Sequence, residues 1–352
     1  MTDVVVAGSG MAGLAAAARA RELGAAVDVY EQGARVGGSM LLSSGVIWRY
    51  SEWEEFRRQC PDGDEALQRT VHEGVDEGID WLRSLGAVVT EEATGNPLTA
   101  GKRFDTRELC MAMLRTGPSL RIGSPLEELP DGVPVVLATG GFQGDPDLVR
   151  RHVTPEADAL LLRSNAGNRG DGLRMGLAAG GELSAGMGEF YGRAMPAVRA
   201  LHESQWVQAA QLYARWASSI ESSDGAVYDG QVDWAEVDVV EWIARQPGAR
   251  AWFVVPESAL DERARYGTVA DMIERARGLG AAVERLDNGV RVEVVAAITQ
   301  TLGGLRADSN GRVARGVWAA GGDIGGVATG GYMSNLAAAL VIGRRAAEDA
   351  LS

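Results

Sequence analysis

The chain has 352 residues, a net charge of −14 and 46% hydrophobic residues. This length suffices for two domains or for one large domain with an insertion. The acidity argues against nucleic acid or an anionic membrane as a partner. The two cysteines and three histidines have neither CxxC nor metal-ligand spacing, so we expect no disulfide framework and no metal site.

The apolar stretches and the first residues of the sequence bear on the expected cellular location. The most apolar stretch, residues 316–343, is interrupted by glycines and carries Asp323, so we do not expect it to span a membrane. An apolar strand is expected as early as Val4, which leaves no room for a signal peptide before it. A cytoplasmic enzyme is therefore the default expectation.

The first 31 residues have the order strand, Gly-rich turn, helix, strand and acid. The turn has the pattern GxGxxG, which with this context predicts a dinucleotide site. Gly8 makes the tight turn, Gly10 lets a pyrophosphate approach the backbone, and Gly13 lets the helix pack close to the strand. The helix N-terminus offers N–H groups and partial positive charge to the phosphates. Glu31 ends the second strand, where its carboxylate can accept from an adenosine ribose and would repel the 2′-phosphate of NADP.

Residues 32–39, QGARVGGS, follow this unit and lead into MLLSSGVIW at 40–48. A dinucleotide unit followed by an acid and RxGGS…SG is similar to the fumarate reductase and 3-ketosteroid dehydrogenase superfamily of FAD enzymes. The resemblance implies that this second Gly-rich loop lies along the pyrophosphate and flavin. Members with covalent FAD carry a histidine in this loop. Because this loop has none, we expect FAD to be held non-covalently.

Four later segments resemble the same superfamily. They are VVLATGGF at 135–142, NAGNRGDGLRMGLAAGG at 165–181, TLGGL at 301–305 and VWAAGGDIGG at 317–326. Asp323 stands where the family has an acid that could accept from the ribityl hydroxyls. Ser334 is a candidate cap for the last helix, and the resemblance implies that this helix points its N-terminus at the flavin N1 and C2 carbonyl. The expected cofactor-binding residues are Gly8, Gly10, Met11, Ala12, Gly13, Glu31, Gln32, Gly37, Gly38, Ser39, Ser43, Ser44, Gly45, Ala138, Thr139, Gly140, Asn165, Asp171, Gly322, Asp323, Ser334, Asn335 and Leu336.

Between these segments the pattern predicts further elements. Apolar residues at helical spacing predict a helix over Asp64 to Leu85, and Asp105 with Glu108 forms a capping-box pattern before another helix. Residues 117–134 are expected to hold loop and short strands. The composition changes over 189–293, where five of the nine tryptophans lie. We interpret these tryptophans as core of an inserted domain, or alternatively as a substrate wall.

The expected fold is α/β, a Rossmann-like FAD-binding domain of the glutathione-reductase type with an inserted α+β cap domain. Residues 1–188 form the first part of the FAD-binding domain, 189–293 the cap and substrate domain, and 294–352 the second part. The family's cap closes over the flavin and the substrate.

Three features of fumarate reductases are not found. The histidine before the TxGGL turn is replaced by Ile298-Thr299-Gln300, the final loop 332–335 has no arginine, and residues 215–245 hold no Arg-Asp pair. Fumarate reduction is therefore not expected. Instead, EFYGRAMP at 189–196 and QLYAR at 211–215 resemble the branch with steroid and tricarballylate dehydrogenases. Tyr332 corresponds to the final-loop tyrosine of ketosteroid dehydrogenases, although the PGPG that follows it there is absent.

The expected function is an FAD-dependent oxidoreductase acting on a C–C bond next to a carbonyl or carboxylate, with hydride exchange at flavin N5. Such chemistry needs electrophilic help at the carbonyl oxygen and one proton-transfer group. Tyr332 is the candidate for the carbonyl, unless it only packs the loop, and Tyr191 or Tyr213 is the candidate for the proton. Arg193 and Arg215 could bind a carboxylate or lower a tyrosine pKa, or could be ordinary surface arginines.

Two alternatives stay open on the same scaffold. One is a flavin-dependent oxidase or a tailoring enzyme of small-molecule biosynthesis. The other is a non-catalytic flavoprotein, which a cap of about a hundred residues disfavours because electron carriers expose the flavin edge. In either enzymatic case the partners are a small-molecule substrate and an external electron acceptor or donor.

Overall fold

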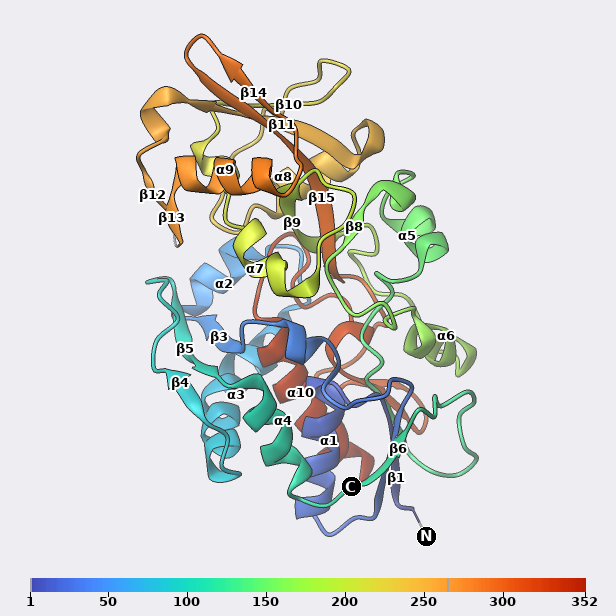
Figure 1. The fold of residues 1–352 in the computed structure, drawn as a ribbon. Coiled ribbons are helices and arrows are strands. Elements are labelled where there is room, and N and C mark those ends of the chain that lie inside the picture. The colour runs from blue at the N-terminus through green and yellow to red at the C-terminus, as the bar shows by residue number, and fades with distance from the viewer. Residues whose placement is uncertain (1, 265) are drawn as a thin grey trace. The chain divides into compact units, whose positions relative to one another are not determined.

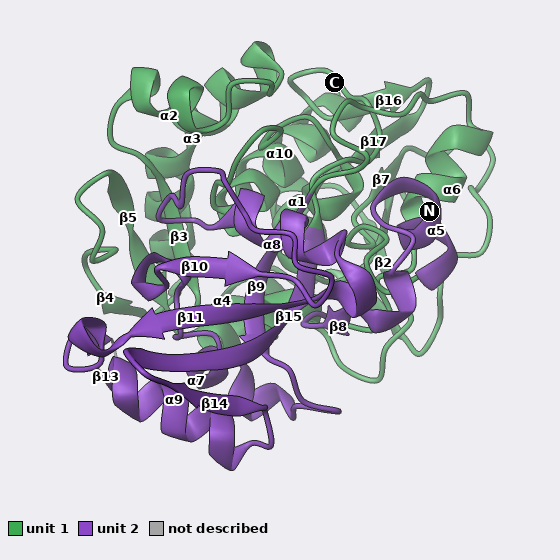
Figure 2. Cartoon of the chain, turned by 90° about the horizontal axis from the view of Figure 1, so that it is seen from above, with its two compact units in different colours: residues 1–145, 165–189, 301–352 green, residues 146–164, 190–300 purple. Residues whose placement is uncertain are grey.

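The computed structural model describes residues 2–264 and 266–352. The chain forms two compact units, coloured green and purple in Figure 2. Unit 1 comprises Met1–Asp145, Asn165–Glu189 and Thr301–Ser352, and unit 2 comprises Pro146–Ser164 and Phe190–Gln300. Both units are therefore built from segments that are separated in the sequence.

Unit 1 is organised around a six-stranded sheet with the strand order β16-β17-β7-β1-β2-β6. The pairs from β17 to β6 are parallel, and β16 pairs antiparallel with β17. A smaller sheet has the order β3-β5-β4. This confirms the Rossmann-like α/β fold predicted from the first 31 residues. The strands are β1 (Val4–Ala7), β2 (Val27–Glu31), β3 (Val46–Tyr50), β4 (Val89–Glu91), β5 (Thr99–Phe104), β6 (Ser119–Ile122), β7 (Val135–Leu137), β16 (Arg312–Ala314) and β17 (Val317–Ala319).

Helix α1 (Met11–Glu22) is the buried centre of unit 1, and its small side chains allow this. Alanine favours the helix, and the four residues Ala15 to Ala18 are completely buried. Helix α10 (Asn335–Ala350) packs against α1 (Figure 1, red beside blue). The backbones approach closely because a Cβ on Gly343 would lie 2.5 Å from the carbonyl oxygen of Ala12.

Two other helices of unit 1 begin at the caps that the sequence pattern predicts. Asp64 accepts from the N–H of Leu67 at 3.0 Å and caps α3. Asp105 accepts from two N–H groups and caps α4. These helices are α2 (Trp53–Gln59), α3 (Glu65–Ser84), α4 (Thr106–Leu114) and α6 (Asp171–Ala178).

Unit 2 has an α+β composition, which confirms the predicted class of the insertion. Its sheet contains the order β10-β11-β15-β14, and β8 and β9 also pair with β15. The elements are α5 (Pro146–His152), β8 (Leu161–Leu162), β9 (Phe190–Pro196), α7 (Trp206–Ala209), β10 (Ser219–Glu221), α8 (Val237–Ala244), β11 (Arg250–Pro256), β12 (Arg263–Ala264), β13 (Gly267–Thr268), α9 (Val269–Gly278), β14 (Val283–Leu286) and β15 (Gly289–Thr301).

The compact units differ from the domain boundaries expected at 189 and 293. Residues 146–164 belong to unit 2, because β8 adds to β15 and the hydroxyl of Thr154 donates to the carbonyl of Ala244 at 2.7 Å. Because β15 is one strand of 13 residues, unit 2 extends through it to Gln300.

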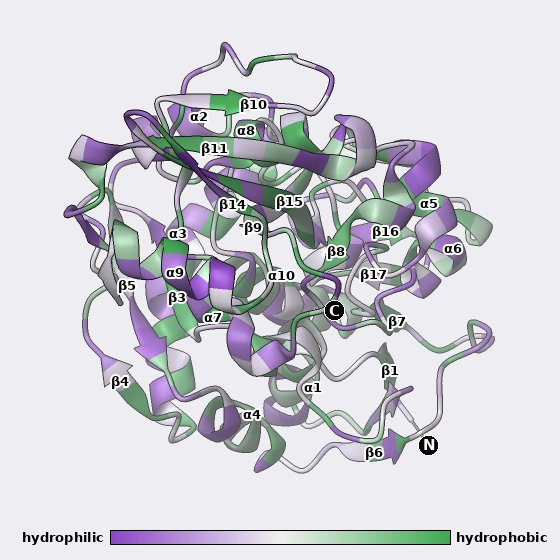
Figure 3. Cartoon of the chain, turned by 45° about the horizontal axis from the view of Figure 1, so that its top comes forward, coloured by the Kyte–Doolittle hydropathy of each residue, from purple (hydrophilic) through white to green (hydrophobic). Residues whose placement is uncertain are grey.

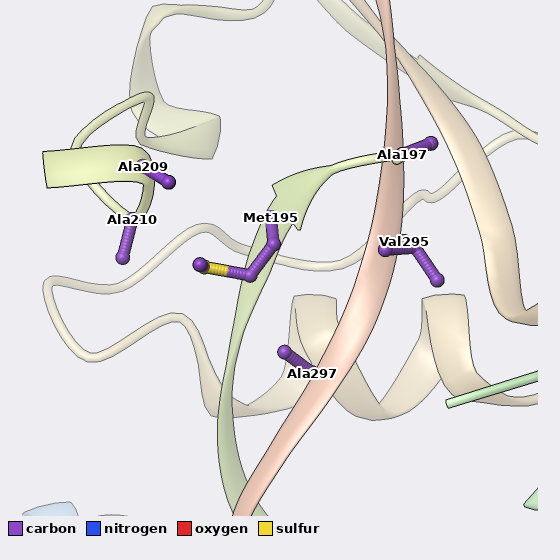
Figure 4. Close-up of a cluster of buried hydrophobic side chains, with 6 residues drawn as sticks. All are labelled: Met195, Ala197, Ala209, Ala210, Val295 and Ala297. Atoms are coloured by element: carbon purple, nitrogen blue, oxygen red, sulfur yellow. The ribbon is translucent and has the colours of Figure 1, made fainter. Parts of the chain in front are cut away.

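A cluster of buried hydrophobic side chains packs β9, β15 and the end of α7 together (Figure 4). It consists of Met195, Ala197, Ala209, Ala210, Val295 and Ala297. Trp206 packs against its edge, and Trp216 is 5% exposed. On α9, Met272 and Ile273 are buried while Glu274 faces solvent, so that helix carries both colours in Figure 3. Within the described residues, no helix is long and apolar enough to cross a membrane.

Candidate functional site

The turn between β1 and α1 is shaped by three glycines with different surroundings. Gly8 has φ +102°, and a Cβ there would lie 2.2 Å from the carbonyl oxygen of Ala138. A Cβ on Gly13 would lie 1.9 Å from the carbonyl oxygen of Gly8. By contrast, a Cβ on Gly10 would meet no protein atom within 4 Å. Two of these glycines are therefore needed for packing, whereas Gly10 faces open space.

This open space fits the pyrophosphate of FAD. Gly10 is the N-cap of α1, and no side chain caps that helix. Gly10 has no side chain that could accept from the N–H groups of the first turn, including those of Met11 and Ala12, so these groups can bind an anion. Gly38, in the second Gly-rich loop, lies beside Gly10, since its Cβ would be 3.3 Å from the Gly10 Cα. The two predicted phosphate-binding loops therefore line the same open space beside Gly10.

Glu31 ends β2 with its carboxylate partly engaged. One carboxylate oxygen accepts from the N–H of Ser9 at 3.0 Å and from the Ser9 hydroxyl, and the other accepts from the N–H of Gly33 at 2.6 Å. The second oxygen keeps acceptor capacity for a ribose hydroxyl. The Ser9 contact was not predicted, and it holds the Glu31 carboxylate against the Gly-rich turn.

The loop 165–172 joins three segments that the sequence singled out separately. Gln32 donates to the carbonyl of Gly167 at 2.8 Å, and Asn168 donates to the hydroxyl of Ser39 at 3.0 Å. The hydroxyl of Thr139 accepts from the N–H of Gly172 at 2.9 Å. Asn165 accepts from the N–H of Gly167 within the loop. The region after β2, the second Gly-rich loop and the end of β7 thus converge on one loop.

Asp323 has a different setting from the one expected of a cofactor ligand. It is 1% exposed, and its carboxylate accepts from the N–H and hydroxyl of Thr139 and from the N–H groups of Gly140 and Gly141. Burial raises the pKa of Asp323, and these hydrogen bonds oppose the rise. Asp323 thus shapes the loop after β7, and its ribityl contact stays a prediction.

Other predicted cofactor residues lie at element ends. Gly37 has φ +109° and precedes the 3-10 turn Gly38–Leu42, after which the exposed Ser43 and Ser44 lead to Gly45, with φ +72°. Asp171 begins α6 and pairs with Arg174 at 2.6 Å. Gly322 packs on Gly140, and Asn335 and Leu336 form the first turn of α10.

The final loop is anchored to β3. Ser334 caps α10 by accepting from the N–H of Ala337 at 3.3 Å, as predicted, and it donates to the carbonyl of Val46 at 3.3 Å. The hydroxyl of Tyr50 donates to the backbone carbonyl of Tyr332 at 2.6 Å. The Tyr332 ring packs edgewise on Trp48, with 5.6 Å between centroids. The position of Tyr332 in unit 1 is thereby fixed by backbone and ring contacts.

Four of the five predicted catalytic residues lie together in unit 2. Tyr191 and Arg193 are on the same face of β9 because they are two residues apart. The Arg193 guanidinium carbon is 5.8 Å from the Tyr191 ring centroid and 5.1 Å from that of Tyr213. Arg215 lies 5.2 Å from the Tyr213 ring and 4.6 Å from the Trp216 ring. We call Tyr191, Arg193, Tyr213 and Arg215 the tyrosine–arginine cluster.

The two arginines of this cluster differ in whether a carboxylate pairs with them. Arg193 pairs with Glu236 at 3.4 Å and donates to the carbonyl of Ala235 at 3.2 Å. Within the described residues, no ion pair holds the exposed Arg215. Glu236 was missed at the sequence level, because it lies 43 residues from Arg193 in an acidic stretch without a recognisable motif.

Comparison with known proteins identifies the family of the chain. Residues 3–119 and 132–335 match the family described as FAD binding domain. A vinyl phenol reductase from Lactiplantibacillus plantarum is 25% identical over 237 residues, which are 54% of this chain and 48% of that protein. The chain thus aligns with about half of that relative.

Solved structures share the fold. An open flavocytochrome c3 fumarate reductase has a TM-score of 0.71 at 20% identity, with 99% of this chain and 78% of that chain covered. A 3-ketosteroid delta1-dehydrogenase from Sterolibacterium denitrificans has a TM-score of 0.72 at 14% identity, with 99% of both chains covered. With the family match over most of its length, the chain belongs to the FAD binding domain family of flavoprotein oxidoreductases, and FAD is its cofactor.

Proposed function

We propose that this chain is a dehydrogenase or reductase of a C–C bond adjacent to a carbonyl or carboxylate. The observation that carries the proposal is the gathering of Tyr191, Arg193, Tyr213 and Arg215 within unit 2. Bound FAD supplies the two-electron acceptor or donor. The protein has to supply a proton-transfer group and positive charge for an oxygen that becomes more negative. Tyrosines beside arginines provide both.

Each residue has a proposed task. Tyr332 donates a hydrogen bond to the substrate carbonyl oxygen, and Tyr191 or Tyr213 holds the proton that is exchanged with substrate carbon. Arg215 binds an anionic group of the substrate, since its charge is not neutralised by a carboxylate in the described structure. A relative named vinyl phenol reductase supports the reductive direction.

The proposal is tested with the dithionite-reduced holoenzyme under anaerobic conditions. Conjugated enones, α,β-unsaturated carboxylates and vinyl phenols are mixed with it in turn, and flavin reoxidation is followed by absorbance. We expect at least one enone or unsaturated carboxylate to reoxidise the flavin and to be converted to its saturated product, whereas reduction of vinyl phenols alone would contradict the carbonyl or carboxylate part of the proposal. If no alkene in the panel does so, and no saturated counterpart reduces the oxidised enzyme, the proposal is wrong.

Fumarate is expected to fail in the same assay. A dicarboxylate needs two cationic sites, but Arg193 is already paired with Glu236 and the final loop 332–335 supplies no arginine. Fumarate should therefore not raise the reoxidation rate above the buffer control. Reduction of fumarate at an ordinary enzymatic rate would mean that other cations of the protein bind the second carboxylate.

The FAD is expected to be bound without a covalent link. The loop 37–50 contains no histidine, and the fit at Gly10 requires no bond to the protein. Acid or heat precipitation should release all of the yellow colour into the supernatant, and chromatography should identify it as FAD. Colour that stays in the pellet would contradict the non-covalent link, and release of FMN would contradict the ribose role of Glu31.

A further inference from the structure

Glu236 in unit 2 combines an unfavourable backbone conformation with the burial of an ionisable side chain. It is the N-cap of α8 and has φ 59°, a left-handed conformation that, among the described non-glycine residues, only Ala249 shares. It is also 3% exposed, although it is an ionisable residue. Carboxylates are seldom buried without a compensating partner. A strained backbone and a buried acid at one residue suggest that the side chain has a task.

The carboxylate of Glu236 connects three elements. One oxygen accepts from the N–H of Ala214, at 2.6 Å, in the 3-10 turn Ala214–Trp216. The other pairs with Arg193 of β9 at 3.4 Å, while Glu236 itself begins α8. Ala214 stands between Tyr213, which caps this turn, and Arg215, which lies within it. A single carboxylate therefore links both halves of the tyrosine–arginine cluster.

We propose that Glu236 is a positioning residue, whose charged carboxylate holds Arg193 between the rings of Tyr191 and Tyr213. When Glu236 takes up a proton, it loses its attraction for Arg193, and the cation is no longer held against the two rings. The inference assigns no contact between Glu236 and substrate or cofactor. It rests on the proposed function in one respect, namely that Tyr191 or Tyr213 exchanges the proton with the substrate.

The charges around Glu236 set the pH at which this change occurs. Burial raises the pKa of Glu236 to about 7, and Arg193 together with the backbone N–H groups of Ala214 and Arg215 opposes the rise. Asp233 adds a like charge from the preceding turn and accepts from the N–H of Glu236. Burial also raises the pKa of Asp233, with Asp238 as a further like charge. Glu236 is therefore charged above about pH 7 and neutral below it.

The test follows the NMR resonances of the tyrosines in the holoenzyme as the pH is varied, with no substrate present. The seven tyrosines are labelled with 13C at Cζ, and the resonance of Tyr213 is assigned by its loss in Tyr213→Phe. In the native protein we expect this resonance to shift with a midpoint near pH 7. In Glu236→Gln, which keeps the shape but cannot ionise, the step should disappear. If the proposed function is wrong, this step should still be observed, because its measurement needs no substrate.

Glu262→Gln is the matched control. Glu262 is an exposed carboxylate that accepts from the indole N–H of Trp216 at 3.0 Å, so it lies beside the cluster but does not touch Arg193. This variant should keep the step. If Glu236→Gln fails to fold, Arg193→Met replaces it, because loss of the cation should also remove the step. The inference is overturned if the native protein shows no step between pH 5.5 and 8.5, or if the step persists in the variant.

Discussion

Gly10→Ala is expected to give a folded protein that has lost most of its affinity for FAD. The Gly10 backbone has φ −74°, which alanine adopts freely, and the added methyl meets no protein atom within 4 Å. Only a bound ligand at the N-terminus of α1 would be affected. Overpacking by one methyl costs about 1–3 kcal/mol, which weakens FAD binding roughly 5- to 150-fold.

Two further variants separate this effect from damage to the fold. Gly278→Ala also adds a methyl in open space, but in unit 2, and should bind FAD as the native protein does. Gly13→Ala should lose both FAD and thermal stability, because its methyl would overlap the Gly8 carbonyl. FAD affinity is measured by titrating apoprotein, and stability by thermal melting. Native affinity in Gly10→Ala would mean that the pyrophosphate does not approach this residue.

Tyr332→Phe is expected to slow flavin turnover by the substrate roughly a hundred- to a thousandfold. A donor aimed at an oxygen that gains negative charge in the transition state contributes about this much. Two contacts that hold Tyr332 in place survive the change, because Tyr50 donates to its backbone carbonyl and Trp48 packs on its ring. FAD content and melting temperature should therefore stay at the native values.

Tyr228→Phe is the control for losing a phenol hydroxyl. The Tyr228 hydroxyl donates to the carbonyl of Gln231 at 3.0 Å, and neither residue belongs to the tyrosine–arginine cluster. Turnover by Tyr228→Phe should stay within a few-fold of the turnover of the native protein. Rates are measured by stopped-flow absorbance with an alkene that reoxidises the reduced enzyme. Unchanged turnover in Tyr332→Phe would leave that residue as packing and make Tyr191 and Tyr213 the next targets.

The features that could be predicted from sequence are those with local causes. The GxGxxG turn needs three small residues at fixed spacing, and Ser334 or Asp64 caps a helix within its own first turn. The helix 65–84 follows from apolar residues repeated at helical spacing. In each case the sequence signal itself spans only a few residues, so it can be read without knowing the distant partners, such as Ala138 beside Gly8.

The features that could not be predicted depend on distant partners. Strand β8 has two residues and joins unit 2 only by pairing with Ala297 and Ile298, more than a hundred positions away. Glu236 meets Arg193 through the packing of α8 on β9. Asp323 was noticed, but its donors at 139–141 lie before the insertion, so the role of its carboxylate was not visible.

The placement of β17 and α10 has a consequence for how the protein is made. β17 pairs with β7, and α10 packs against the alanine-rich α1, yet both follow the insertion and so are synthesised long after their partners. Between β7 and β17 a ribosome needs roughly ten to forty seconds at about 5–20 residues per second. During that time β7 is an open edge of the nascent sheet and α1 is uncovered, so unit 1 cannot be completed before the insertion has been synthesised.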